Sequence, residues 1–487
     1  MNCLRLICLL PALWLAGALA AQPADTLTLE QTVARAQARS LPALRACADL
    51  LQAGLRHRSF RAGLLPQVAL SGSVPNFINT FSQTTQPDGT IAFQRITYNN
   101  SSLALEATQA IAPLGMTLFV QTSLQRYDDF QAELRSYNAV PVRAGFVQPL
   151  SAYNPLRWQA RLDPLRLREA QKQYQFDLEA VRTAAQQLFF ELLLAQIDGE
   201  LAESNLAISE TLYAIAQERY GLGKISQNDL LQLELERVNA LKARQDAAQA
   251  ADQARAQLAA FLGGPIEGPL HLVAPPPDSL PPVDAADALM LAAARRPEFE
   301  TWRRSRMEAA EQTARAQARN GFQATIQASV GTAGSAAALA PLYRSPQPEQ
   351  AVMMELSIPL LNWGRAKAET GLMRQEEAYL AAWQDQQQQR MELDLRQTLA
   401  ACERLQRALR LAAQAEDIAR SQSAISQARY RLGEISTTDL TLSLRARDLA
   451  RRAYAASLRD YWQARQSLRM FTLYDFAAGT PISYPEP

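Results

Sequence analysis

A stretch of twelve residues occurs twice in this chain and constrains its fold more than any other feature. The first copy, RYGLGKISQNDL, occupies residues 219–230, and the second, RYRLGEISTTDL, occupies residues 429–440. Eight of the twelve positions agree, and the copies lie 210 residues apart. In each copy a glycine ends a long helical pattern and a Ser/Asn/Thr/Asp cluster restarts it, which predicts a helix C-cap followed by an N-cap. The chain is therefore a duplication with two antiparallel helical hairpins.

The helices that flank the two turns are predicted to be very long. Residues 155–221 carry a helical pattern with one internal proline, Pro164, and residues 365–431 carry its equivalent. At the helical rise each span is roughly 100 Å long. Shorter helices are predicted over 41–63, 227–262, 297–320 and 437–470. Helices of this length, with alanine on several faces, are typical of a coiled coil or the wall of a tube.

Amphipathic strands precede each long helix. Residues 68–74 alternate apolar and polar side chains, and residues 324–330 repeat the pattern at an offset of 256. Return strands at 142–146 and 352–356 match at an offset of 210, so the first strand region holds 46 extra residues. Alternation on both sides of Pro113-Leu114-Gly115 predicts an added β-hairpin there, with a folded surface loop as the alternative. Such strands belong either to a sandwich or to a barrel with one lipid-facing side.

Charge and residue counts exclude several function classes. The chain has 49 basic and 48 acidic residues, so it shows no nucleic-acid footprint. The two histidines, His57 and His271, are far apart in sequence and leave few options for a metal site or a catalytic triad. No nucleophile–base set or phosphate loop is apparent. We therefore expect no enzyme activity, no catalytic residues, no cofactor and no metal. Cys47 and Cys402 are interpreted as small buried residues rather than a disulfide.

The first twenty residues have the pattern of a secretory signal. Arg5 precedes an apolar run from Leu6 to Leu19, and Ala18-Leu19-Ala20 offers a cleavage site after Ala20. Cys8 follows Ile7 rather than a small residue, so a lipid anchor is not expected. No later segment has eighteen consecutive apolar residues, so a membrane role would have to come through strands.

This order of elements resembles the TolC family of outer-membrane efflux proteins. The resemblance covers nearly the whole predicted mature chain, and its sharpest marks are the two turns and Gln148-Pro149-Leu150. It implies a mostly α protein with β structure, in which duplicated long-helix hairpins form an α-helical barrel and β-hairpins contribute to a trimeric transmembrane β-barrel. The implied location is the outer membrane with a periplasmic tunnel. The implied partners are two further copies, a periplasmic adaptor protein, an inner-membrane pump and outer-membrane lipid, with no nucleic acid.

The resemblance also implies roles for residues of the two turns, which it places at the periplasmic tip. The residues at the gate would be Tyr220, Asp229, Tyr430 and Asp439. The residues that dock the adaptor would be Leu222, Gly223, Lys224, Ile225, Leu432, Gly433, Glu434 and Ile435. Ile435 and Leu442 stand where well-known members carry an arginine and a second aspartate. From the residues alone, Asp229 and Asp439 have a second reading as helix N-terminal caps.

The function implied by the resemblance is that of an exit duct in a tripartite efflux system, which passively exports small molecules received from the pump and adaptor. One alternative is the outer-membrane component of type I protein secretion. The alternative from a different class is a periplasmic coiled-coil scaffold that forms no channel. The predicted segments are 1–20 signal peptide, 21–65 N-terminal helices, 66–150 first β-barrel strand region with an inserted hairpin, 151–262 first long helical hairpin, 263–296 connector or equatorial segment, 297–320 short helix, 321–361 second β-hairpin, 362–472 second long helical hairpin and 473–487 C-terminal tail.

Overall fold

A computed structural model describes most of the chain, and the predicted signal segment 1–20 and its cleavage site lie outside the described residues. Described are residues 25–85, 89–151, 153–265, 270–277 and 281–486. The chain divides into two compact units. One unit comprises Met1–Gln52, Glu169–Phe299 and Gln386–Pro487, and the other comprises Ala53–Arg168 and Glu300–Asp385.

The long helices are present where the sequence predicts them. Helix α3 runs from Pro155 to Gly221 over 67 residues and continues through Pro164. Helix α8 runs from Arg365 to Leu432 over 68 residues, one residue beyond the predicted end. The other main helices are α1 (Leu29–Arg39), α2 (Leu41–Gly63), α4 (Gln227–Phe261), α6 (Pro297–Arg319) and α9 (Thr437–Thr472). None of the described helices contains a stretch apolar enough to cross a bilayer.

The described part of the segment predicted as a connector or equatorial segment, 263–296, contains a strand and a helix. It contains strand β7 (Leu270–Leu272), which pairs in parallel with β1 (Asp25–Leu27). It also contains helix α5 (Ala285–Arg295), whose Ala288 and Ala292 are buried.

A hydrophobic core holds the helical unit together around α3 and α9. Phe189 and Phe190 of α3 are fully buried and meet edge to face, with ring centroids 5.6 Å apart. Tyr461 and Leu458 of α9 belong to the same cluster and are almost completely buried. Burial of large aromatic side chains contributes most of the hydrophobic free energy at such a site, so this region anchors the unit.

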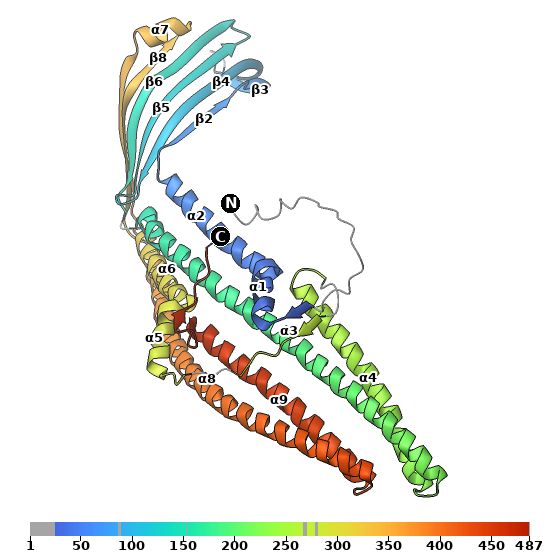
Figure 1. Cartoon of the computed structure of the whole chain (residues 1–487). Helices are drawn as coiled ribbons and strands as arrows, with labels where there is room; N and C mark the ends of the chain where they lie inside the picture. The colour runs from blue at the N-terminus through green and yellow to red at the C-terminus, as the bar shows by residue number, and fades with distance from the viewer. Residues whose placement is uncertain (1–24, 86–88, 152, 266–269, 278–280, 487) are drawn as a thin grey trace. The chain divides into compact units, whose positions relative to one another are not determined.

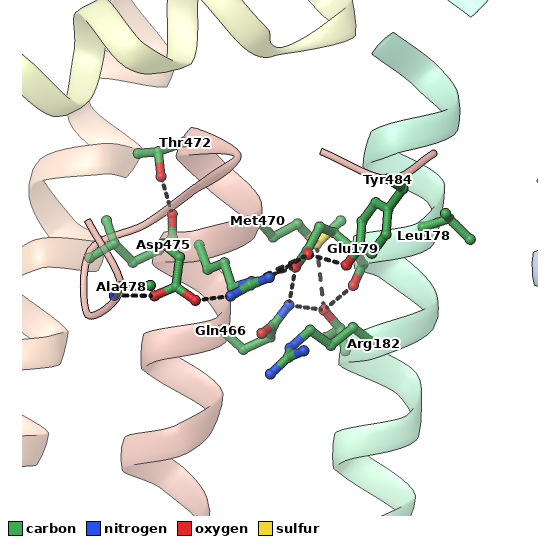
Figure 2. Close-up of polar contacts among 12 residues, drawn as sticks. Leu178, Glu179, Arg182, Gln466, Met470, Thr472, Asp475, Ala478 and Tyr484 are labelled. Atoms are coloured by element: carbon green, nitrogen blue, oxygen red, sulfur yellow. Dashed lines mark hydrogen bonds and ion pairs between the residues drawn. The ribbon is translucent and has the colours of Figure 1, made fainter. Parts of the chain in front are cut away.

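A buried carboxylate, Glu179 of α3, joins α3 to α9 and to the C-terminal tail (Figure 2). Its side chain is 0% exposed and accepts hydrogen bonds from Arg469 Nε at 3.1 Å, Gln466 Nε2 at 2.8 Å and Tyr484 Oη at 2.5 Å. Arg469 also pairs with Asp475. Burial, together with the adjacent Glu179 carboxylate, raises the pKa of Tyr484 to about 12. We call these five residues the Glu179 clasp.

The tail that carries Tyr484 lies along α3. The backbone N–H of Tyr484 donates to Gln175 Oε1 at 2.6 Å, and Gln175 Nε2 donates back to the Tyr484 carbonyl at 2.9 Å. Gln171 donates to Glu486 at 2.9 Å. Short strands β10 (Tyr474–Asp475) and β11 (Thr480–Pro481) precede this contact. The tail is therefore a bound part of the helical unit.

Neither of the two described cysteines forms a disulfide. Cys402 is buried and its thiol donates to the Ala464 carbonyl at 3.3 Å, whereas Cys47 is half-buried. Burial raises the pKa of Cys402 to about 11. Because the thiolate is the reactive form, a thiol reagent at pH 8 should label Cys47 well before Cys402 in the folded protein. Mass spectrometry of labelled peptides measures the two rates, and equal rates before unfolding would contradict this burial.

The second unit contains a seven-stranded antiparallel sheet (Figure 1). Six strands follow the order β2-β4-β5-β6-β8-β9, and the seventh, β3, pairs with β4. The strand bounds are β2 Gln67–Ser73, β3 Phe77–Thr85, β4 Ile91–Ile111, β5 Met116–Asp129, β6 Leu134–Pro149, β8 Gln323–Ala336 and β9 Gln347–Ser357. The hairpin predicted around Pro113-Leu114-Gly115 is present as β4 and β5. Strand β3 was not predicted. It pairs with the first half of β4, and β2 pairs with the second half, so β2 and β3 share one edge. A short helix, α7 (Leu339–Arg344), joins β8 to β9.

One face of this sheet is apolar from edge to edge. In the register of the ladders, Leu70 of β2 lies opposite Leu105 of β4, and Phe146 of β6 lies opposite Leu118 of β5. At the other edge Met354 of β9 lies opposite Ile326 of β8. Large apolar side chains on this face are exposed, with Leu70 at 70%. The other face carries mostly polar side chains, including an ion pair between Arg143 and Glu349 at 2.6 Å.

Candidate functional site

Each of the two repeated turns ends its first helix with a Schellman motif. In the first turn the Lys224 N–H donates to the Arg219 carbonyl and the Gly223 N–H donates to the Tyr220 carbonyl, both at 2.9 Å. In the second turn the Glu434 N–H donates to Arg429 and the Gly433 N–H donates to Tyr430, both at 3.0 Å. The two glycines have φ values of 67° and 83°, in the left-handed region. Glycine is required there because a Cβ would be strained.

Each turn then starts its second helix with a capping box. Ser226 Oγ accepts from the Asp229 N–H at 3.2 Å, and the Asp229 carboxylate accepts from the Ser226 N–H at 3.1 Å. Ser436 and Asp439 repeat the arrangement at 3.2 Å and 3.3 Å. Each aspartate therefore accepts a hydrogen bond from the N–H group of the N-cap serine of its own helix. This is the capping role that the sequence offered as the second interpretation of Asp229 and Asp439. Both also remain exposed to solvent.

The two tyrosines of the repeated motif have different environments. Tyr430 is 5% exposed and belongs to a cluster with Leu212, Leu233 and Leu440, which come from α3, α4 and α9. The Arg219 guanidinium lies 5.6 Å from its ring centroid. Tyr430 thus packs the two hairpins against each other, and we call this group the Tyr430 cluster. Tyr220, at the equivalent place, is 43% exposed.

Among the described residues, no hydrogen bond joins one predicted gate residue to another. The described hydrogen bonds of Asp229 go to Ser226, and those of Asp439 go to Ser436, rather than to a tyrosine. Arg219, which sequence reasoning did not single out, is the charged residue placed over Tyr430. The sequence signal that could have pointed to this contact is the Arg-Tyr pair that both copies of the motif contain.

Polar contacts missed by sequence reasoning also link the two hairpins. Arg447 of α9 donates to Asn205 of α3 at 2.7 Å, and Asn205 donates to Asp448. Two ion pairs of α9 reach the first hairpin, from Arg445 to Glu236 of α4 at 2.9 Å and from Arg452 to Asp198 of α3 at 2.6 Å. The partners are more than 200 residues apart in the chain, so no local pattern could reveal them.

A groove borders the Tyr430 cluster between the hairpins. It has a volume of about 360 Å³ and is lined by Ile208, Leu212, Tyr430 and Leu440, with Arg431 and Arg447 as its cationic members. The turn residues beside it present apolar side chains, since Leu222 is 69% exposed and Leu432 is 75% exposed. Lys224 is exposed as well, and Glu434 pairs with Arg429 at 3.1 Å. Ile225 and Ile435 pack at the margin of the cluster.

Removing one capping side chain should loosen the start of α9 only. Ser436→Ala deletes the acceptor for the Asp439 N–H, and loss of an N-cap costs about 1 kcal/mol. Hydrogen exchange in the first turn of α9 should therefore accelerate about fivefold, because these amides exchange by local opening. Thr438→Ala is the matched control, since Thr438 is an exposed residue of the same turn. Equal acceleration in both variants would show that the cap contributes nothing.

Comparison with solved structures gives a consistent result, although no family model and no curated protein matches the chain. The Campylobacter jejuni CmeC outer membrane channel aligns with a TM-score of 0.67 at 13% identity, over 98% of this chain and 96% of that one. The open state of the Neisseria gonorrhoeae MtrE outer membrane channel aligns with a TM-score of 0.64 at 16% identity, over 94% and 90%. The outer membrane protein VceC from Vibrio cholerae aligns at 0.62 and 16% identity, over 93% and 97%.

The chain has the fold of these outer-membrane channels. The resemblance drawn from the sequence is thereby confirmed at the level of the fold, across nearly the whole length of the chain and of its structural relatives. Because the sequence identity to these structures is low, we infer the roles of individual turn residues from the geometry of the turns.

Proposed function

We propose that this protein is an outer-membrane exit duct with a periplasmic helical tunnel, which passively conducts small molecules and has no chemistry of its own. The observation that carries the proposal is the apolar face of the sheet, which continues from β2 to β9. The side chains of Val352 and Leu70 on this face are 80% and 70% exposed. Such exposed apolar surface is unfavourable in water and favourable in contact with lipid. A periplasmic scaffold without a channel would leave this face in water.

The free ends of the sheet support an oligomer. In the described chain β2 and β9 stand at the ends of the strand order, and open edges are not tolerated in lipid. Six strands lie side by side in each copy, so a trimer would close 18 strands. At a strand spacing of ~4.8 Å and a tilt of ~40° such a barrel is about 36 Å wide. Without the inserted β4–β5 hairpin, the four remaining strands would give a barrel about 24 Å wide.

The tip is proposed as the place where a periplasmic adaptor docks and where the duct narrows. Leu222 and Leu432 offer exposed apolar anchors beside exposed polar groups, a combination that suits a protein contact. Gly223 and Gly433 hold the backbone of these anchors in place. The Tyr430 cluster connects the hairpins directly behind them. Movement of one hairpin relative to the other would therefore have to disturb Tyr430.

Single-channel recording in planar bilayers tests the duct and its tip. Purified protein should conduct, and Asp229→Ala combined with Tyr430→Phe should raise the conductance, because it removes one cap and one polar group near the cluster. Asp439→Ala should lower the preference for cations, since its exposed carboxylate would border the narrow opening. Thr438→Ala serves as the control variant.

The outcomes separate the claims. Conductance that is unchanged in the double variant would reduce Asp229 and Tyr430 to capping and packing. A wild-type protein that does not conduct, in any lipid tested, would contradict the duct itself. Passage of an unfolded polypeptide but of no small solute would favour the secretion alternative.

A further inference from the structure

The charged residues on the apolar face of the sheet are gathered at one end of it. In the described ladders the strands β2, β8 and β9 place no charged side chain on this face. The charged residues that do lie on it are Arg95 of β4, Arg126 and Asp128 of β5, and Arg135 of β6. All four lie toward the end of the sheet that is away from the junctions with α2, α3, α6 and α8. Three arginines and one aspartate leave two positive charges there.

One carboxylate holds two of these arginines in place. Arg126 donates from Nε to Asp128 Oδ2 at 2.8 Å and from Nη2 to Oδ1 at 3.1 Å, and Arg135 Nε donates to Oδ1 at 2.8 Å. Asn99 Nδ2 also donates to Oδ2, at 3.1 Å. The side chain of Asp128 is only 8% exposed, whereas those of Arg126 and Arg135 are 45% and 58% exposed. We call these four residues the Asp128 cluster.

The cluster begins one step beyond the apolar part of the face. Leu103 of β4 lies opposite Leu124 of β5, and the next pair on the same face is Ser101 with Arg126. Two residues of a strand span about 7 Å. In the proposed barrel the helices extend into the periplasm, so this end of the sheet meets the outer leaflet of the membrane. The arginines would then lie at the level of the lipid headgroups.

Aromatic side chains border the cluster on the same face. Phe77 of β3 lies opposite Asn99, and its ring meets that of Phe130 edge to face with centroids 5.7 Å apart. Phe77 and Phe130 are 56% and 54% exposed. Tyr137 lies opposite Arg126. The cluster therefore combines cationic groups with exposed aromatic surface, which is typical of the boundary between hydrocarbon and headgroups.

The donor geometry favours a phosphate ligand. A guanidinium group presents paired N–H donors that match phosphate oxygens. The described contact of Arg135 with Asp128 uses Nε, which leaves its two terminal amino groups for a ligand. Asp129 does not oppose an anion here, because it points to the other face and accepts two backbone N–H groups of the following turn. If the arginines served only to neutralise Asp128, one of them would suffice.

We propose that the Asp128 cluster binds the phosphate group of a glycolipid in the outer leaflet of the membrane. Arg126 and Arg135 donate to the phosphate oxygens, Asp128 orients both guanidinium groups, and Phe77 and Phe130 contact the adjoining part of the lipid. The inference rests on the proposed barrel, since it requires this face of the sheet to meet lipid. It also gives a binding role to the inserted β4–β5 hairpin, which carries three of the four residues of the cluster.

Native mass spectrometry of the full-length, detergent-extracted protein tests the site. The probe is lipid A with both of its phosphate groups, added in increasing amounts. Arg135→Gln should weaken its binding about tenfold, because a charge-assisted contact is lost. Asp128 keeps Arg126 and Asn99 in this variant, so the sheet should still fold. Arg135→Lys keeps the charge without the paired donors and should weaken binding less than Arg135→Gln does.

The matched control is Arg143→Gln. Arg143 lies on the other face of the same strand as Arg135 and pairs with Glu349. Its replacement removes the same charge from the protein and should leave lipid binding unchanged. An equal loss in Arg143→Gln and Arg135→Gln would show a response to overall charge and would contradict a site at the Asp128 cluster.

Two further probes identify the ligand. The wild-type protein should bind lipid A lacking both phosphates about tenfold more weakly than the phosphorylated form, and Arg135→Gln should discriminate much less. Inorganic phosphate alone, added in excess, should not displace the lipid, because the aromatic contacts require the lipid body. Displacement by inorganic phosphate would overturn the lipid as the occupant of the site.

Insertion into lipid vesicles, followed by protease protection, separates this site from the duct. Protein that inserts but binds both forms of lipid A equally would overturn the phosphate site and leave the duct intact. Protein that does not insert at all would overturn the barrel, and the lipid site with it.

Discussion

Replacement of Glu179 by alanine is expected to lower the free energy of unfolding by about 3 kcal/mol, because it removes one partner of a buried ion pair. Glu179 is 0% exposed and holds Arg469, Gln466 and Tyr484 at once. The expected loss stands at the lower end of the range for such pairs, since Arg469 keeps its contact with Asp475. Denaturant unfolding followed by circular dichroism measures the loss.

Two companion variants identify the cause. Glu179→Gln keeps the shape and part of the hydrogen bonding, so it should recover part of the stability. Glu200→Ala removes an exposed glutamate from the same helix and should change the stability by less than about 0.5 kcal/mol. Hydrogen exchange should show the tail around Tyr484 released in Glu179→Ala only. A loss no greater than that of Glu200→Ala would contradict the role of the Glu179 clasp.

An arginine on the apolar face of the sheet should prevent stable membrane insertion, whereas an arginine on the other face should be tolerated. Val120 and Gln121 are neighbours on β5 and point to opposite faces. In the proposed barrel, Val120→Arg would place a charge toward lipid and should cost about 2–4 kcal/mol near the bilayer midplane. Gln121→Arg is the matched control, because its side chain would face water in the duct. Folding into lipid vesicles, followed by protease protection, measures the difference.

Equal behaviour of the two arginine variants would indicate that neither face meets lipid. A loss confined to Gln121→Arg would assign the faces the other way round. Either result would contradict the proposed barrel while leaving the helical unit unaffected.

The elements with strong local signals could be predicted from the sequence alone. Helix α3 begins at Pro155 and ends at Gly221 as predicted, because proline suits a first helical turn and the Schellman glycine fixes the end. The β4–β5 hairpin was predicted because strict alternation stands on both sides of Pro113-Leu114-Gly115. Strand β3 escaped prediction, since its sequence FINTFSQTT does not alternate cleanly.

The contacts that determine the site could not be predicted, because they join distant parts of the chain. Tyr220 and Tyr430 share one motif, and only tertiary packing buries the second. The partners of Glu179 lie close to 300 residues further along the chain. The sequence around the two aspartates of the turns strongly predicts helix capping, and both aspartates form capping boxes in the structure. Whether they also act on ions depends on the assembly rather than on any local pattern.

Electron cryo-microscopy of the full-length protein extracted from membranes would show whether several copies close one barrel. We expect three copies around one axis, with their sheets closed into a single barrel of 18 strands and their helices forming a tunnel. A water-soluble single copy, or copies whose sheets remain open and separate, would contradict it.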